Sequence, residues 1–174
     1  MTALEKAREL LGTYEGEWKL FAVDAEGKTA VKAQWKDQVH VVNATEEEDR
    51  AFVTAINTMD FGSAQGMTTF REGYMKAPDG SAGQRFIEIG GETVIQTEIQ
   101  PGLWTFPAKL DLTELRSLGI EPSLLSGARQ VMVKMVDGDT EWVTRLTMLV
   151  RPELSGEKKF TSLTTLQGFH RRIR

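Results

Sequence analysis

The chain has 174 residues, of which 40% are hydrophobic and 26% are charged, and its formal net charge is −4 at pH 7. This length suits one domain with enough apolar side chains to fill a core. The absence of cysteine excludes disulfides, thiol catalysis and cysteine-ligated metals, and two histidines are too few for a histidine-rich metal site. The acidity disfavours a nucleic-acid partner, and no apolar run reaches the ~18–20 residues of a membrane span. Residues 1–12 contain no apolar leader, so we expect a cytoplasmic protein unless a signal peptide has been removed.

A short helix is predicted at the N-terminus, over residues 2–11. Thr2 is a suitable N-cap, and Glu5 follows three positions later, as in a capping box. The apolar stripe of this helix comprises Leu4, Ala7, Leu10 and Leu11.

Strands are predicted for most of the remaining chain. Turn signals such as Pro78-Asp79-Gly80, Gly90-Gly91 and Asp137-Gly138-Asp139 separate short segments rich in Val, Ile, Thr, Phe and Trp. Apolar residues recur at every second position in three of these segments, which predicts antiparallel strands with one face in the core. The faces expected to point inward are Val31, Ala33, Trp35, Val39 and Val41; Thr93, Ile95, Thr97 and Ile99; and Trp142, Thr144, Leu146, Met148 and Val150.

The interval from residue 107 to residue 127 departs from the strand pattern. Its acidic and leucine residues predict a two-turn helical insertion near residues 111–119, which ends by Gly119 and Pro122. This segment would cover the barrel mouth as a lid, pack on the outside of the barrel, or form a subunit contact. The last alternative leaves a homodimer open.

About nine or ten strands are expected, each of the usual ~5–10 residues. A sheet of that size has two open edges unless it closes on itself. Sequential hairpins favour closure into an up-and-down barrel over a two-sheet sandwich. The sequence therefore predicts one all-β domain over residues 1–174, an up-and-down antiparallel β-barrel with a short N-terminal helix.

The N-terminal motif resembles that of a known superfamily. The run Leu11-Gly12-Thr13-Tyr14-Glu15-Gly16-Glu17-Trp18 leads from the predicted helix into a Gly-x-Trp sequence at the first strand. This arrangement resembles the calycin superfamily of lipocalins and fatty-acid-binding proteins, and most closely small bacterial lipocalin-like domains of uncharacterised function. In that superfamily the tryptophan closes one end of the barrel, and a basic residue of the last strand packs across its ring. The resemblance implies that Trp18 and the terminal Arg171 and Arg172 close the barrel here.

Some family features are missing from this chain. The second and third lipocalin motifs are absent, and so is the Arg-x-Tyr carboxylate clamp of fatty-acid-binding proteins. The resemblance therefore implies the fold more than the function.

Three polar residues fall in register with apolar neighbours and are candidate site residues: Asp37, Asn57 and Arg85. Because a buried charge needs a partner or solvent, such residues often mark a hydrated cavity. Asp37 would be a base or a ligand anchor, and Arg85 its partner or a carboxylate clamp. The alternatives are a bulge near residue 37 that reverses the alternation, or positions at the barrel rim.

Aromatic rings and methionines are the candidates for the wall of a binding cavity, because the former stack on flat ligands and the latter adapt to apolar ones. Core packing is their alternative role. The ligand-binding residues that we expect are Trp35, Asn57, Met59, Arg85, Trp104, Trp142 and Met148. His170 would be an acid–base group or a haem ligand, although its place beside the terminal arginines favours a structural role.

Two functions fit these residues. One is binding of a small hydrophobic or amphipathic molecule inside the barrel, with no cofactor or metal. The other is a cofactor-independent cyclase or isomerase of the natural-product type, in which Asp37 is the catalytic base. A filled barrel that acts as an interaction module through residues 107–127 is a third alternative.

Overall fold

The structure is a computed structural model of the chain, and it describes residues 1–23, 26–108, 113, 116, 128–152 and 158–174. Of residues 149–152 and 158–162 it describes only the backbone. The helix predicted near residues 111–119 lies outside the described residues, apart from two isolated positions.

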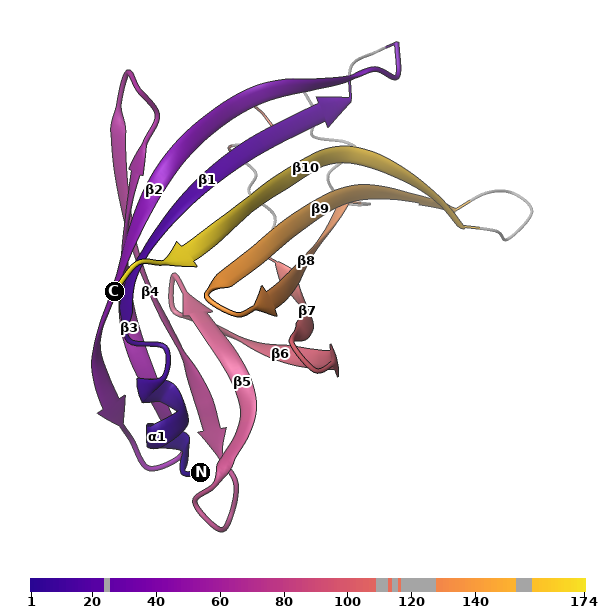
Figure 1. Cartoon of the computed structure of the whole chain (residues 1–174). Coiled ribbons are helices and arrows are strands. Elements are labelled where there is room, and N and C mark those ends of the chain that lie inside the picture. The colour runs from indigo at the N-terminus through magenta and orange to yellow at the C-terminus, as the bar shows by residue number, and fades with distance from the viewer. Residues whose placement is uncertain (24–25, 109–112, 114–115, 117–127, 153–157) are drawn as a thin grey trace.

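A closed antiparallel barrel of ten strands makes up the described chain (Figure 1). Each strand pairs with the next in sequence, and β1 pairs with β10, so no edge remains open. The up-and-down barrel and the short N-terminal helix predicted from the sequence are thereby confirmed. The elements are α1 (Ala3–Arg8), β1 (Gly12–Val23), β2 (Thr29–Glu46), β3 (Arg50–Asp60), β4 (Gln65–Lys76), β5 (Ala82–Ile89), β6 (Glu92–Gln100), β7 (Leu103–Ala108), β8 (Ala128–Asp137), β9 (Thr140–Pro152) and β10 (Lys158–Arg172).

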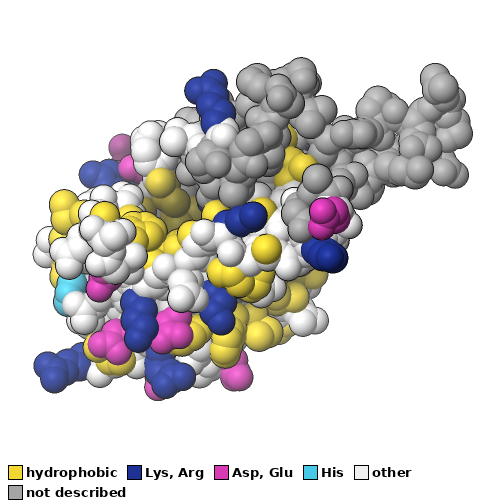
Figure 2. Space-filling view, turned by 90° about the horizontal axis from the view of Figure 1, so that it is seen from above, with side chains coloured by type: hydrophobic (Ala, Val, Ile, Leu, Met, Phe, Trp, Pro, Cys, Tyr) yellow, Lys and Arg dark blue, Asp and Glu magenta, His cyan; other side chains and the backbone are white. Residues whose placement is uncertain are grey.

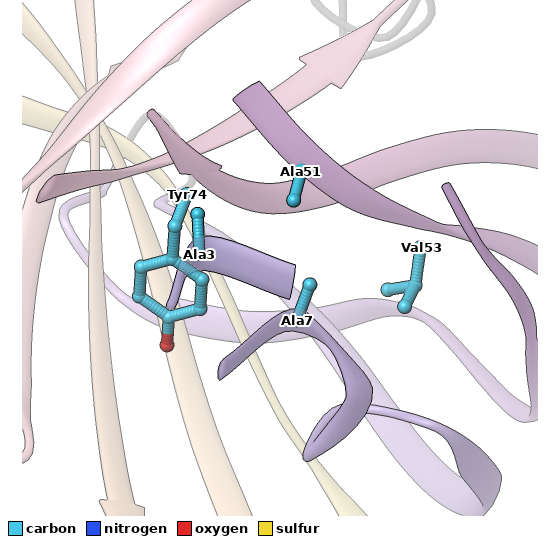
Figure 3. Packing of buried hydrophobic residues seen from close by; sticks show 5 residues of the cluster. All are labelled: Ala3, Ala7, Ala51, Val53 and Tyr74. Atoms are coloured by element: carbon cyan, nitrogen blue, oxygen red, sulfur yellow. The ribbon is translucent and has the colours of Figure 1, made fainter. Parts of the chain in front are cut away.

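The helix α1 lies inside one end of the barrel, against strands β2 to β5. The predicted capping box starts it, since Thr2 accepts a hydrogen bond from the Glu5 backbone and Glu5 accepts one from Thr2. Small side chains on one face let the helix approach the sheet closely (Figure 3). The resulting apolar cluster contains Ala3, Ala7, Ala51, Val53 and Tyr74.

A second apolar cluster fills the barrel farther from α1. It contains Trp18, Leu20, Val143 and Leu166, with Ala33, Trp35 and Met132 packed against them. Polar side chains separate the two clusters. On β2, for example, Asp37 lies between Val41 of the first cluster and Trp35 of the second.

The predicted inward face is correct in β2 from Ala33 to Val41 and wrong for Val31, which is 50% exposed beyond a register shift between β1 and β2. It is wrong in β6 and β9. In β6 the buried residue is Gln96, whereas Ile99 is 62% exposed. In β9 Val143 and Thr147 are buried, and Trp142 is 48% exposed on the outer face with Met148 at the same parity. The alternation misleads here because the interior side of these strands carries polar residues while the outer side carries apolar ones.

Some apolar side chains of the barrel lie on its outer surface. The outward Trp142 packs its ring against Phe169 of β10 at 5.3 Å. Figure 2 shows one face of the molecule, on which hydrophobic side chains lie exposed among basic and acidic ones. An apolar alternation in this chain is therefore not by itself a signal of burial.

Candidate functional site

The Gly-x-Trp motif of β1 meets a Gly-x-His sequence in β10. The register places Gly16 opposite His170 and Trp18 opposite Gly168. A Cβ on Gly168 would lie 2.3 Å from the Trp18 ring, and one on Gly16 would lie 2.2 Å from Asp37 Oδ1. Each glycine is thus required because a large or polar side chain fills the space beside it.

Asp37 is the centre of a buried polar group. Its Oδ2 accepts hydrogen bonds from Trp18 Nε1 at 2.9 Å, Asn57 Nδ2 at 3.1 Å and His170 Nε2 at 2.9 Å. The Asp37 side chain is only 1% exposed, and its Oδ1 has no hydrogen-bond partner among the described residues. No bulge occurs at residue 37, because the β1–β2 register runs unbroken from Gly12 to Leu20.

The arginine expected on the Trp18 ring is not there. His170 packs edge-on against Trp18, with ring centroids 5.2 Å apart, and Trp35 stacks on Trp18 at 6.3 Å. Arg171 instead lies over the Phe169 ring. Because β10 runs antiparallel to β1, Arg172 pairs with Tyr14, four residues along the strand from Trp18 and too far to cover it.

Arg172 has a different structural role, which is to hold the chain that follows α1. Its guanidinium donates hydrogen bonds to the backbone carbonyls of Glu9 and Leu11. Nearby, the Tyr14 hydroxyl donates to the Leu10 carbonyl at 2.9 Å. The last and first strands together therefore fasten the helix inside the barrel, since cations near a helix C-terminus satisfy its free carbonyls.

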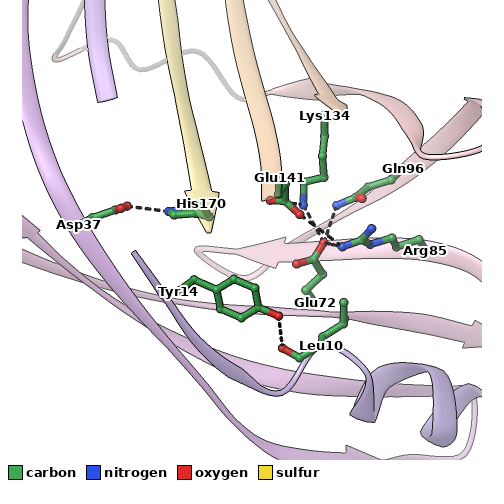
Figure 4. A network of polar contacts seen from close by, with 9 residues as sticks. All are labelled: Leu10, Tyr14, Asp37, Glu72, Arg85, Gln96, Lys134, Glu141 and His170. Atoms are coloured by element: carbon green, nitrogen blue, oxygen red, sulfur yellow. Dashed lines mark hydrogen bonds and ion pairs between the residues drawn. The ribbon is translucent and has the colours of Figure 1, made fainter. Parts of the chain in front are cut away.

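A cluster of ion pairs lies inside the barrel, on the other side of the interior from Asp37 (Figure 4). Glu72 Oε1 accepts from Arg85 Nη2 at 2.6 Å, Lys134 Nζ at 2.9 Å and Gln96 Nε2 at 3.3 Å. Glu141 closes the cluster, 3.2 Å from Lys134 and 3.8 Å from Arg85. Two carboxylates thus balance two cations, as a buried charge cluster requires.

The cluster favours the charged forms of Glu72 and Arg85. Burial by itself raises the pKa of Glu72, but Arg85 and Lys134 outweigh it and hold that pKa at about 2. Burial likewise lowers the pKa of Arg85, while Glu72 and Glu141 raise it, and the net direction is upward. At neutral pH Glu72 and Arg85 are therefore fixed charges inside the barrel.

A cavity of about 1080 Å³ opens between α1, β6 and the β8–β9 turn. Arg85, Gln96 and Glu141 lie on its polar side. Its aromatic lining consists of Tyr14, Tyr74 and Trp104. The Arg85 guanidinium stacks on the Trp104 ring at 4.9 Å, and burial raises the pKa of both tyrosines.

A smaller cavity of about 50 Å³ lies deeper in the barrel. It is lined by His170 and Glu72 and by apolar residues of β2 to β4. It shares four lining residues with the large cavity, namely Leu10, Tyr14, Arg85 and Glu141. The two spaces are therefore adjacent, with His170 at the inner one.

The structure brings together only some of the residues that the sequence predicted for the site. Arg85 and Trp104 line the large cavity side by side, whereas Asp37 and Asn57 belong to the group around His170. The remaining predicted residues, Trp35, Met59, Trp142 and Met148, line neither of these two cavities.

Sequence reasoning missed several residues of the site: Tyr14, Glu72, Tyr74, Gln96, Lys134 and Glu141. A usable signal was present for two of them. Glu72 alternates with Phe70 and Tyr74, and Lys134 alternates with Met132, in the way that singled out Asp37.

No protein-family model matches the chain, and no curated protein matches its sequence significantly. Within the residues that the structure describes, no helix combines the length and hydropathy needed to cross a membrane. In the same residues no three His, Asp or Glu side chains are grouped closely enough to hold a metal ion.

Proposed function

We propose that this protein binds a small amphipathic molecule in the cavity beside α1. The observation that carries the proposal is a cavity of about 1080 Å³ in which a buried ion cluster adjoins aromatic walls. Small-molecule sites are typically concave and largely apolar, with a few fixed polar groups that orient the ligand. A ligand with one polar end and one apolar body suits these surroundings.

The polar end of the ligand would lie on Arg85 and Gln96. Both residues line the cavity. A ligand whose polar end carries an acceptor would pair with the Arg85 guanidinium, since hydrogen bonds to a charged donor are the stronger ones.

The apolar body of the ligand would pack on the rings of Tyr14, Tyr74 and Trp104. Aromatic rings supply a large contact area with little loss of conformational freedom. The closed ten-stranded barrel is compatible with a calycin-like fold, and we include in the proposal a distant relationship to that superfamily. The relationship is supported by the helix that leads into Gly16 and Trp18 at the first strand.

The experiment is a titration of the purified protein with the amphipathic fluorophore 1-anilinonaphthalene-8-sulfonate, together with native mass spectrometry for a co-purified molecule. We expect saturable binding of one probe per chain. Trp104→Leu removes a wall of the cavity and is expected to weaken binding about tenfold, which is about 1.4 kcal/mol.

The matched control is Trp142→Leu, which changes a tryptophan on the outer face. It is expected to leave the affinity within about twofold, which is about 0.4 kcal/mol. Circular dichroism and thermal unfolding establish that both variants are folded. Absence of saturable binding in the unmodified protein, or equal losses in the two variants, would contradict the proposed site.

A further inference from the structure

We propose that His170 transfers protons to and from the molecule bound in this cavity, and that Asp37 is the residue that positions it. The protein would then be a cofactor-independent isomerase of enolisable carbonyl compounds. This inference rests on the binding function proposed above and adds a reaction to it.

The imidazole of His170 is held in one orientation. Its Nε2 lies 2.9 Å from Asp37 Oδ2, and its ring packs edge-on against Trp18 at 5.2 Å. Asp37 is itself fixed by hydrogen bonds from Trp18 and Asn57. When a carboxylate accepts the Nε2 proton, the neutral imidazole keeps Nδ1 as a free base. Within the described residues Nδ1 makes no hydrogen bond.

His170 is also accessible from the ligand cavity. Its side chain is 14% exposed and lines the small cavity of about 50 Å³, which adjoins the large one at Tyr14 and Glu141. A water molecule occupies about 30 Å³ in the liquid, so this space has room for a small group at one end of a larger molecule. The end of the ligand that enters it would meet the imidazole.

A structural role alone is a poor explanation of this pair. The Asp37 carboxylate is almost fully buried, with three donors on Oδ2 and none on Oδ1 among the described residues. Apolar side chains of similar volume often stabilise a core as well as such a buried polar group does. A buried carboxylate at Asp37 is explained if it orients His170 for catalysis, as the aspartate of a catalytic triad orients its histidine.

The reaction needs no partner besides the bound molecule. His170 Nδ1 removes a proton from a carbon next to a carbonyl group, and the electrons of the C–H bond form an enolate. Asp37 stabilises the resulting imidazolium, and the Arg85 guanidinium, which lines the same small cavity, stabilises the enolate oxygen. In a β,γ-unsaturated carbonyl compound the enolate is conjugated with the C=C bond, so return of the proton from Nδ1 to the γ-carbon moves the double bond and completes the isomerisation without an oxidant or a reductant.

The test uses 5-nitrobenzisoxazole as the probe, because a base that removes its C3 proton breaks its N–O bond and releases a coloured cyanonitrophenolate. We expect saturable turnover by the unmodified protein and a loss of about 10²- to 10⁴-fold in His170→Gln, the usual contribution of a general base. The matched control is His40→Gln, which alters an exposed histidine outside the barrel and is expected to retain full activity.

Asp37→Asn distinguishes a positioning role from a structural one. It is expected to lower kcat with KM nearly unchanged, because the probe still binds while the imidazole loses its orientation. A change in KM alone would contradict the positioning role.

Failure of this inference is separable from failure of the binding proposal. If the fluorophore binds and 5-nitrobenzisoxazole displaces it, but turnover is the same in His170→Gln, the proton-transfer role is wrong and binding stands. If His170→Gln does not fold, the unmodified protein is treated with diethyl pyrocarbonate instead, which modifies histidine side chains. Mass spectrometry then distinguishes modification of one histidine from modification of the other. Loss of turnover in step with His170 modification supports the role, and full turnover after it overturns the role.

Discussion

Replacing Glu72 by Gln tests whether the buried ion cluster stabilises the barrel as its geometry indicates. Glu72 is the only member of the described cluster whose oxygen contacts both Arg85 and Lys134 at less than 3 Å. Glutamine keeps the size of the side chain and one acceptor oxygen but removes its charge. The two cations would then share the single remaining carboxylate of Glu141, which lies farther from each of them.

The expected loss follows from the pKa of Glu72. A carboxyl group whose pKa is held at about 2 in the native state, against 4.5 ordinarily, stabilises that state at neutral pH by about 3 kcal/mol. Breaking one partner of a buried ion pair typically costs about 3–5 kcal/mol, which agrees. Because the native pKa is lowered, this stabilisation is complete above pH 4.5 and is lost as the pH falls towards about 2.

Urea unfolding at several pH values, followed by circular dichroism, measures the effect. At pH 7 Glu72→Gln is expected to be less stable than the unmodified protein by about 3 kcal/mol, and the difference is expected to shrink below pH 4.5. The control is Glu88→Gln, which breaks outer-face ion pairs with Arg50 and Arg71 and is expected to cost at most about 1 kcal/mol. Equal stability of Glu72→Gln and the unmodified protein at pH 7 would refute the reasoning.

Charge balance can be tested separately with the double variant Glu72→Gln/Lys134→Met. It removes one carboxylate and one cation, leaving Arg85 with Glu141. We expect the double variant to be more stable than the sum of the two single changes predicts by about 0.5–3 kcal/mol, the coupling usual for residues in one ion-pair network. Additive losses would mean that the two side chains do not interact.

Two further predictions concern the packing of the first and last strands. Gly168→Ala is expected to lower stability by about 1–3 kcal/mol in thermal unfolding, because its Cβ would lie 2.3 Å from the Trp18 ring. The control is Gly66→Ala, whose Cβ would meet only the movable ends of side chains and which should cost less than about 1 kcal/mol. Equal costs in the two variants would argue against tight packing at Gly168. Arg172→Gln is expected to speed amide hydrogen exchange in residues 3–11 without changing exchange in the central strands, and unchanged exchange there would show that Arg172 does not fasten the helix.

The sequence by itself determined the architecture of this protein. Alternation of period two, interrupted by Asp-Gly and Gly-Gly turns, specifies antiparallel hairpins, and a sheet of this length avoids open edges by closing. Local chemistry also placed the N-terminal helix, because a capping box involves residues only three positions apart. Asp37 was found inside the barrel because its strand alternates cleanly and no bulge interrupts it there.

Only the tertiary structure decided which polar residues meet. Lys134 and Glu72 are 62 positions apart, and they touch because barrel closure brings their strands to opposite walls of one narrow interior. The inward face of β9 could not be read from its alternation, since that strand has apolar residues outside and Glu141 and Thr147 inside. A hydrophobic alternation identifies the face of a strand that is unfavourable in water. In β9 the buried face is polar instead, and its charge is tolerated inside the barrel because it pairs with opposite charges on other strands.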